Sequence, residues 1–137
     1  MHNDPARVFA WPVRVYYEDT DFGGVVYYAN YLRYFERART EWLRSLGVDQ
    51  QRLAAEDGLQ FVVRRAEIDF LRGARLDDAL SITVQVMERK HTYLRLRQCA
   101  LRAEEPMAEA MVQAACVRRD NFKPAPLPAA LAARLAG

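Results

Sequence analysis

The strongest constraint on the fold is a single change of hydrophobic period along the chain. Residues 30–47, NYLRYFERARTEWLRSLG, repeat apolar side chains at the three- and four-residue spacings of an amphipathic helix. The stripe consists of Tyr31, Phe35, Ala38, Trp42 and Leu46, widened by Leu32 and Leu43. Asn30 is a suitable N-cap and Gly47 a suitable stop. The sequence thus predicts one long helix whose broad apolar face needs a sheet packed against it.

Beyond this helix the apolar residues recur at every second position, which is the period of a β-strand. Strands are predicted within residues 61–70, 80–86, 92–103 and 107–119, and one more, over residues 13–17, precedes the helix. Turn-forming residues in short links separate the last three strands, which predicts antiparallel hairpins. The chain is therefore expected to be α+β, with a five-stranded antiparallel sheet wrapped around one long central helix.

Two short segments complete the chain, which we interpret as one domain over residues 1–137. Residues 50–57 are expected to form a short second helix that Gly58 ends. The Ala/Leu run after the prolines of KPAPLPAALAARLAG predicts a final short helix. One helix covers only one face of such a sheet, whose two edges stay free to pair. We therefore expect subunits to pair in a dimer or a larger oligomer.

Charge and composition argue against several classes of protein. Lys and Arg total 20 against 18 Asp and Glu, a net charge of +2, and the basic residues are spread out rather than gathered as in nucleic-acid-binding proteins. No apolar run approaches the roughly 18 residues that cross a bilayer, and the N-terminal residues do not resemble an export signal, so a cytoplasmic protein is expected. Cys99 and Cys116 lack the paired spacing of zinc ligands and are predicted to be buried free thiols.

The segment VYYEDTDFGGVVYYANY, residues 15–31, carries two aspartates between the first strand and the long helix. Some phosphatases place Asp-x-Asp after a strand, but their fold needs a parallel sheet with repeated βα units. A calcium loop needs oxygen ligands at alternating positions, whereas Asp21 is followed by Phe, Gly, Gly, Val and Val. A purely structural role stays open for Asp19 and Asp21, because Asp is common in turns and caps.

The position of this segment favours a catalytic interpretation. A carboxylate near the start of a long helix lies close to unpaired N–H groups, which can stabilise an oxyanion. Gly23 and Gly24 remove side chains there and let an acyl group approach the backbone. These features suit attack on a thioester, whose thiolate leaving group needs little protonation.

Nearly the whole chain resembles the hotdog-fold acyl-CoA thioesterases of the 4-hydroxybenzoyl-CoA thioesterase family, and most closely their Tol-Pal-associated YbgC branch. The resemblance rests on WPVRVYYEDTDFGGVVYYANYLRYFERARTEWLRSLG, FVVRRAEIDFLRGARLDD and KPAPLP. It implies a hotdog fold, acyl-CoA as substrate, and dimers or tetramers with active sites at subunit interfaces. Asp21 matches the family's catalytic carboxylate, as general base or as nucleophile, and Tyr17 matches a Tyr whose hydroxyl could orient it. Asp19 is left as a turn residue, and we expect neither a cofactor nor a metal ion.

One position departs from the YbgC branch, which usually has His seven residues after the catalytic Asp, where this chain has Tyr28. The hydroxybenzoyl-CoA branch has Tyr at this place, and there the backbone N–H at the helix start polarises the thioester carbonyl. The resemblance therefore implies that Tyr28 is a backbone oxyanion donor. Substrate contacts are predicted from Gly23, Gly24 and Val25.

Competing predictions concern other residues and another class of protein. Related hotdog enzymes carry the carboxylate on the long helix, which would make Glu36 or Glu41 catalytic. Hotdog dehydratases need an active-site His, and the only candidates are His2, near the terminus, and His91, in a predicted turn. The chain could instead be a non-catalytic module that binds acyl-CoA or an acyl carrier protein. The basic side chains considered for CoA phosphates or an acidic carrier are those of Arg64, Arg65, Arg89 and Lys90.

Overall fold

The computed structural model describes residues 7–136 and is built on a five-stranded antiparallel sheet with the strand order β1-β3-β4-β5-β2. The strands are β1 (Phe9–Arg14), β2 (Leu59–Phe70), β3 (Ala79–Arg89), β4 (Tyr93–Arg102) and β5 (Glu105–Arg118). The helices and helical turns are η1 (Tyr17–Asp19), α1 (Asn30–Ser45), α2 (Gln50–Arg52), η2 (Leu53–Asp57) and α3 (Ala129–Ala136). The predicted α+β class, the four strands after the long helix and both short C-terminal hairpins are confirmed.

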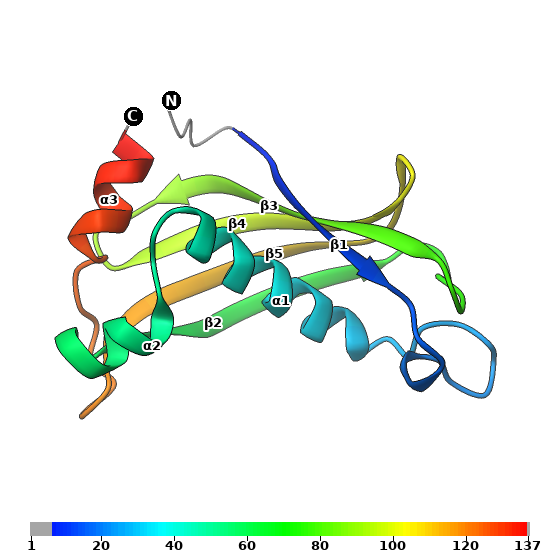
Figure 1. Ribbon diagram of the computed structural model, residues 1–137, viewed down its shortest axis with the longest axis horizontal. Coiled ribbons are helices and arrows are strands. Elements are labelled where there is room, and N and C mark those ends of the chain that lie inside the picture. The colour runs from blue at the N-terminus through cyan, green and yellow to red at the C-terminus, as the bar shows by residue number, and fades with distance from the viewer. Residues whose placement is uncertain (1–6, 137) are drawn as a thin grey trace.

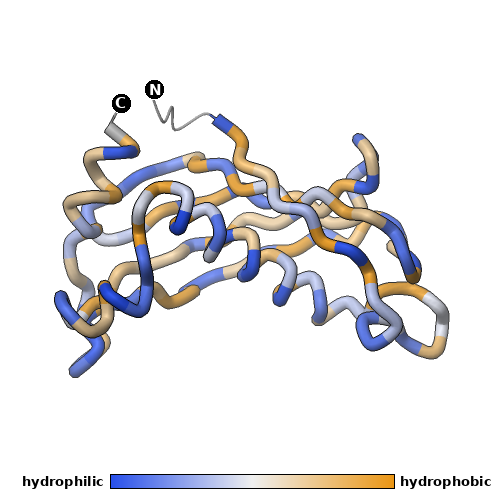
Figure 2. Tube along the Cα trace, viewed as in Figure 1, coloured by the Kyte–Doolittle hydropathy of each residue, from blue (hydrophilic) through white to orange (hydrophobic). Residues whose placement is uncertain are grey.

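α1 lies diagonally across one face of the sheet and contacts β1, β3 and β4 (Figure 1). Hydrophobic and hydrophilic residues alternate along the strands beneath it (Figure 2), as expected for a sheet with one covered face. The predicted apolar stripe is buried: none of Tyr31, Phe35, Ala38, Trp42 and Leu46 is more than 7% exposed. Leu32, which was expected to widen this stripe, is 49% exposed, so that side of α1 faces away from the core.

Two glycines end helical segments where the sequence predicts it. Gly47 follows α1 with φ +81°, and the Val48 N–H after it donates to the Leu43 carbonyl (2.9 Å). Gly58 follows η2 with φ +64°. Both adopt the left-handed conformation that favours glycine, and both predicted stops are confirmed.

The first strand lies earlier in the chain than predicted. β1 begins at Phe9, includes Pro12 and ends at Arg14, whereas the prediction started after this proline and reached Tyr17. Pro12 is tolerated because β1 is an edge strand that pairs only with β3. The strand cannot continue to Tyr17, because the Tyr16 N–H is taken by the Asp19 side chain and the chain turns into η1.

A buried amide ties α1 to the sheet. Gln98 of β4 is fully buried, and its Nε2 donates to the carbonyls of Phe35 (3.0 Å) and Thr83 (3.3 Å). Its Oε1 accepts a hydrogen bond from Arg39 Nη1 (2.9 Å), and burial lowers the pKa of this Arg39. A buried amide with all these partners fixes the distance and the rotation of α1 over the sheet.

Both cysteines are free and buried, as predicted. Cys99 lies in β4 and Cys116 in β5, and burial raises the pKa of both thiols. Both cysteines therefore act as small apolar core residues and not as reactive thiolates.

Candidate active site

Residues 15–29 connect β1 to α1 and lie beyond one end of the sheet, at the lower right of Figure 1. After η1 the chain folds back as a small hairpin over residues 19–27, in which the Asp21 N–H donates to the Val25 carbonyl (2.9 Å). A further hydrogen bond, from the Val26 N–H to the Ala74 carbonyl (2.8 Å), docks this Asp21 hairpin on the segment before β3. The connection is therefore a defined structure with its own hydrogen bonds.

Asp21 opens the turn at the tip of this hairpin. Its Oδ1 accepts a hydrogen bond from the Gly23 N–H (2.8 Å), and its carbonyl accepts one from the Gly24 N–H (3.0 Å). Gly24 has φ +80°, and a Cβ at position 23 would lie 3.2 Å from Asp21 Oδ1. The two glycines therefore shape the turn and leave space for the Asp21 carboxylate. Their contact with a substrate, like that of Val25, stays a prediction.

Asp19 is buried, whereas Asp21 is exposed. Its side chain is 8% exposed, and its Oδ2 accepts a hydrogen bond from the Tyr16 N–H (2.8 Å). Its carbonyl accepts hydrogen bonds from the Tyr27 N–H (2.8 Å) and from Asn30 Nδ2 (2.9 Å). Asp19 thus has the turn role expected for it, and of the two carboxylates it is Asp21 that solvent reaches.

The two residues just before α1 present unpaired backbone donors. The prediction of Asn30 as N-cap is wrong, because the cap position is Ala29. The Asn30 side chain instead donates to the Asp19 carbonyl, a tertiary contact that local sequence does not show. Within residues 7–136 the N–H groups of Tyr28 and Ala29 have no acceptor. They belong to the positive end of α1, where an anion or an oxyanion is stabilised. This geometry suits Tyr28 as a backbone donor, and that role stays a prediction.

A line of aromatic rings runs from the helix start into the core. Successive ring centroids are 4.8, 5.7, 5.8 and 5.9 Å apart in the order Tyr27, Tyr28, Phe70, Tyr31 and Tyr34. A hydrogen bond with Tyr28 raises the pKa of Tyr27. Phe70, which was predicted only as the end of a strand, joins the site because β2 ends beside α1. No local pattern could have shown which rings it would meet.

Three predicted site residues are not brought to the Asp21 carboxylate. Tyr17 lies in η1 with its side chain 81% exposed, and no hydrogen bond links it to Asp21 in the part of the chain that the structure describes. Arg89 and Lys90 lie at the end of β3 next to α3, where Arg89 Nη1 donates to the Ala132 carbonyl (3.0 Å). Because β3 runs the length of the sheet, one chain places this pair at the opposite end from the Asp21 hairpin (Figure 1). A substrate contact across a subunit interface stays a prediction for them.

The competing carboxylates on α1 are engaged locally. Glu36 Oε1 accepts a hydrogen bond from Thr40 Oγ1 (2.7 Å), and Glu41 forms an ion pair with Arg44 (2.7 Å). Both were considered as alternative catalytic residues, and neither lies in the first turn of α1 with the unpaired N–H groups.

The other basic candidates lie along β2. Arg65 is paired with Glu67 (2.6 Å), and Arg64 Nη2 donates to the Phe122 carbonyl (3.4 Å). Both side chains have partners within their own chain, so the structure offers no separate support for a role in binding CoA phosphates.

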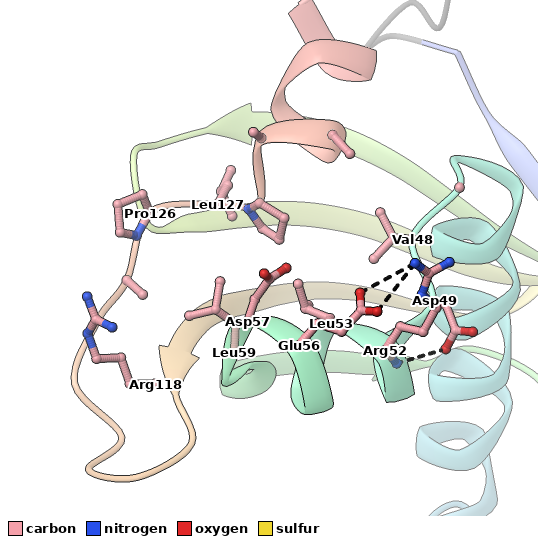
Figure 3. Close-up of a pocket in the computed structure, with 15 residues that line it drawn as sticks. Val48, Asp49, Arg52, Leu53, Glu56, Asp57, Leu59, Arg118, Pro126 and Leu127 are labelled. Carbon is pink, nitrogen blue, oxygen red and sulfur yellow. Dashed lines mark hydrogen bonds and ion pairs between the residues drawn. The ribbon is translucent and has the colours of Figure 1, made fainter.

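An open hollow of about 650 Å³ lies at the other end of the sheet, between α2 and η2 on one side and residues 125–130 on the other (Figure 3). Three of the charged groups that line it serve the local structure. Arg52 pairs with Glu56 (3.4 Å), and Asp49 Oδ1 caps α2 by accepting from the Gln51 N–H (3.0 Å). In Figure 3 the Arg52 side chain points toward the Glu56 carboxylate, and the Asp49 carboxylate accepts from the Arg52 N–H. Size alone therefore does not make this hollow a catalytic centre.

Clusters of metal-ligating side chains and membrane-spanning helices are both absent from the described part of the chain. In residues 7–136 no three His, Cys, Asp or Glu side chains are grouped so that they could hold a metal ion. No helix in the same residues has the length and apolar character needed to span a membrane. His91 is exposed in the turn between β3 and β4, and His2 lies outside the described residues.

Comparison with known proteins decides the family. A model of the family described as the thioesterase-like superfamily matches residues 15–135. This chain belongs to that superfamily. The acyl-CoA thioesterase YbgC of Haemophilus influenzae is 48% identical over 120 residues, which cover 88% of each chain. The acyl-CoA thioester hydrolase YbgC of Escherichia coli O6:H1 is 46% identical over 92% of this chain and 94% of its own length.

A solved structure extends the likeness to the thioesterase fold. The probable thioesterase from Bartonella henselae has a TM-score of 0.85 and 38% identity, and the match covers 89% of this chain and 100% of that one. The expected hotdog fold and the resemblance to YbgC-like thioesterases are confirmed. The expected enzyme class, a thioester hydrolase, is confirmed at the level of the family.

Proposed function

We propose that this protein hydrolyses the thioester bond of an acyl-CoA to a free acid and CoA, with Asp21 as the catalytic carboxylate. The observation that carries the proposal is the Asp21 hairpin itself. It holds an exposed carboxylate and leads directly into the unpaired N–H groups of Tyr28 and Ala29, which have no acceptor within residues 7–136. The names of the YbgC relatives, which are acyl-CoA thioesterases, support this choice of substrate.

The start of α1, with the two residues before it, supplies the electrostatic part of the mechanism. The thioester carbonyl oxygen accepts hydrogen bonds from the N–H groups of Tyr28 and Ala29, and negative charge grows on it as the carbonyl carbon becomes tetrahedral. Donors already fixed at a helix N-terminus stabilise that charge without reorganising. When the intermediate collapses, the bond between carbon and sulfur breaks and CoA leaves as a thiolate.

Asp21 supplies the attack. One of its oxygens is held by the Gly23 N–H, which fixes the carboxylate relative to the turn. As general base it takes a proton from the water that adds to the carbonyl carbon, and this proton later passes to the CoA thiolate or to solvent. As nucleophile it adds to the carbonyl itself and forms an acyl anhydride that water then hydrolyses. Both routes use the same two backbone donors.

The active unit is proposed to contain paired subunits. In residues 7–136 β2 is an edge strand with β5 as its one neighbour, and Val63 and Phe70 on it are 48% and 49% exposed. Phe70 contacts the ring of Tyr28, so pairing along β2 would place a second chain next to the proposed site. Light scattering on the purified protein would test this, because a monomer at working concentration contradicts it. A carrier protein as an additional acyl donor stays a prediction.

The test is thioester hydrolysis across a panel of acyl-CoA substrates with short, long and aromatic acyl groups, measured by release of free thiol. We expect turnover of at least one substrate and its loss in Asp21→Asn. No hydrolysis of any acyl-CoA, together with binding of acyl-CoA, would support a non-catalytic binding module instead. Full activity of Asp21→Asn would show that another residue carries the chemistry.

A further inference from the structure

The two N–H groups proposed to bind the oxyanion are bracketed by hydrogen bonds to a single carbonyl. Tyr28 and Ala29 carry these groups, Tyr27 precedes them and Asn30 follows them. The Tyr27 N–H and Asn30 Nδ2 both donate to the Asp19 carbonyl, at 2.8 and 2.9 Å. The short segment between them therefore cannot move relative to this carbonyl without breaking a hydrogen bond.

The carbonyl that accepts both bonds is itself held. The Asp19 carboxylate is buried and accepts from the Tyr16 N–H (2.8 Å), and the hydroxyl of Tyr34 lies near it in the core. Asp19 also lies only two residues before Asp21 on the same strand of the hairpin. One rigid point thus connects the proposed carboxylate with the proposed oxyanion donors.

The choice of residue at position 30 fits this link. Asn is a poor residue for a helix interior, and its usual value at a helix start is as a cap, which Asn30 is not. What Asn offers here is an amide donor on a short side chain, in a site that is only 9% exposed. An ionised Asp at position 30 would have nearly the same side-chain shape, but its negative charge would face the Asp19 carbonyl oxygen.

We infer that Asn30 is a positioning residue, whose amide holds the Tyr28 and Ala29 donors at their distance from Asp21. The inference rests on the proposed function and adds to it a residue that touches neither substrate nor water in the reaction. Displacing donors by about 1 Å from the productive geometry can cost on the order of 100-fold in rate. Loss of the Asn30 amide is therefore expected to lower kcat far more than it changes substrate binding.

The experiment compares Asn30→Ala and Asn30→Asp with the wild type on the best acyl-CoA substrate. We expect kcat to fall by about 10- to 100-fold in both variants while KM stays within about threefold. Leu131→Ala is the control, because Leu131 is fully buried in α3 at the other end of the sheet and its loss destabilises the protein without touching the hairpin. Urea unfolding of all three variants separates lost stability from lost catalysis.

A second comparison places Asn30 in the same unit as Asp21. In the Asp21→Asn background, Asn30→Ala is expected to lower the residual rate by less than about threefold, because residues that act together are not additive. An active Asp21→Asn would defeat the proposed function. An inactive Asp21→Asn with unchanged kcat in Asn30→Ala would defeat only the role of Asn30. A similar fall of kcat in Leu131→Ala, or failure of both Asn30 variants to fold, would make the role purely structural and overturn the inference.

Discussion

At one end of the sheet the chain builds a small hairpin around Asp21, and at the other end it builds a wide hollow between α2, η2 and residues 125–130 (Figures 1 and 3). The hollow has a volume of about 650 Å³ and is lined by charged side chains. Arg52 and Glu56 pair with each other there, and the Asp49 carboxylate caps α2. The hairpin carries a carboxylate that solvent reaches and backbone donors without acceptors within residues 7–136.

Asp21 is proposed as the catalytic carboxylate because a carboxylate that solvent reaches and unpaired donors at a helix start lie in one connected segment there. Buried backbone N–H groups nearly always find an acceptor inside a folded chain, whereas those at a helix start need not. Donors left free at a helix start can bind an anionic group at no cost to the fold. Arg52 and Glu56 at the far end would first have to break their own ion pair.

The strongest test of the difference between the two ends is to neutralise one carboxylate at each of them. Asp21→Asn is expected to lower kcat by at least about 100-fold, the usual contribution of a general base. Asp57→Asn, in the wall of the hollow, is expected to leave kcat unchanged. Steady-state kinetics on one acyl-CoA compares the two variants directly. Loss of activity in Asp57→Asn would place part of the chemistry in the hollow.

A smaller effect is expected from a single methyl group beside Asp21. In Gly23→Ala the new Cβ would lie 3.2 Å from Asp21 Oδ1, so the carboxylate must shift by a few tenths of an ångström. We expect kcat to fall about tenfold, because attack depends on the position of the carboxylate. Kinetics combined with thermal unfolding tests this. A loss of stability that accounts for the whole change in activity would contradict it.

The matched glycine at the far end should behave in the opposite way. Gly58 has φ +64°, and a Cβ added there would have no atom within 4 Å, so Gly58→Ala strains the backbone without a clash. The free energy of unfolding is expected to fall by about 1 kcal/mol, with kcat unchanged. Urea unfolding and kinetics measure the two quantities separately. A change in kcat would show that the two ends are coupled.

The smallest effect concerns Tyr34, whose buried hydroxyl makes no hydrogen bond in the described residues. Burial and then the nearby Asp19 carboxylate raise its pKa. The pKa of a Tyr side chain in the unfolded chain is about 10. Because the pKa of Tyr34 is higher in the folded state, the free energy of unfolding is unaffected below a pH of about 10 and falls as the pH rises further. Tyr34→Phe should change the free energy of unfolding by less than about 1 kcal/mol at a pH of about 8. At a pH of about 10.5 the free energy of unfolding of Tyr34→Phe should rise relative to that of the wild type.

Urea unfolding at the two pH values gives the sign of that difference. A variant that loses stability at the lower pH by much more than this amount would mean that the hydroxyl has a partner in solution. In that event the Tyr34 hydroxyl and the Asp19 carboxylate would form part of the support beneath the Asp21 hairpin.

Part of the candidate site could be read from the sequence, because it depends on local features. Asp21 and Asp19 differ by their place relative to a glycine turn, and the start of the long helix is visible from its period. The position of Phe70 beside Tyr28 could not be predicted, because it depends on where β2 ends relative to α1. The hydrogen bond of Asn30 to Asp19 was missed because it depends on how residues 19–27 fold back to the start of α1.

By itself the sequence determined the long helix, the four strands after it and the stops at Gly47 and Gly58. These depend on periodicity and on backbone conformations that act within a few residues. Only the tertiary structure decided that Asn30 binds the Asp19 carbonyl and that Arg89 lies at the far end of the sheet from Asp21. Both depend on how segments apart in the sequence meet, and the fold of residues 19–27, the strand order and the helix placement set that together.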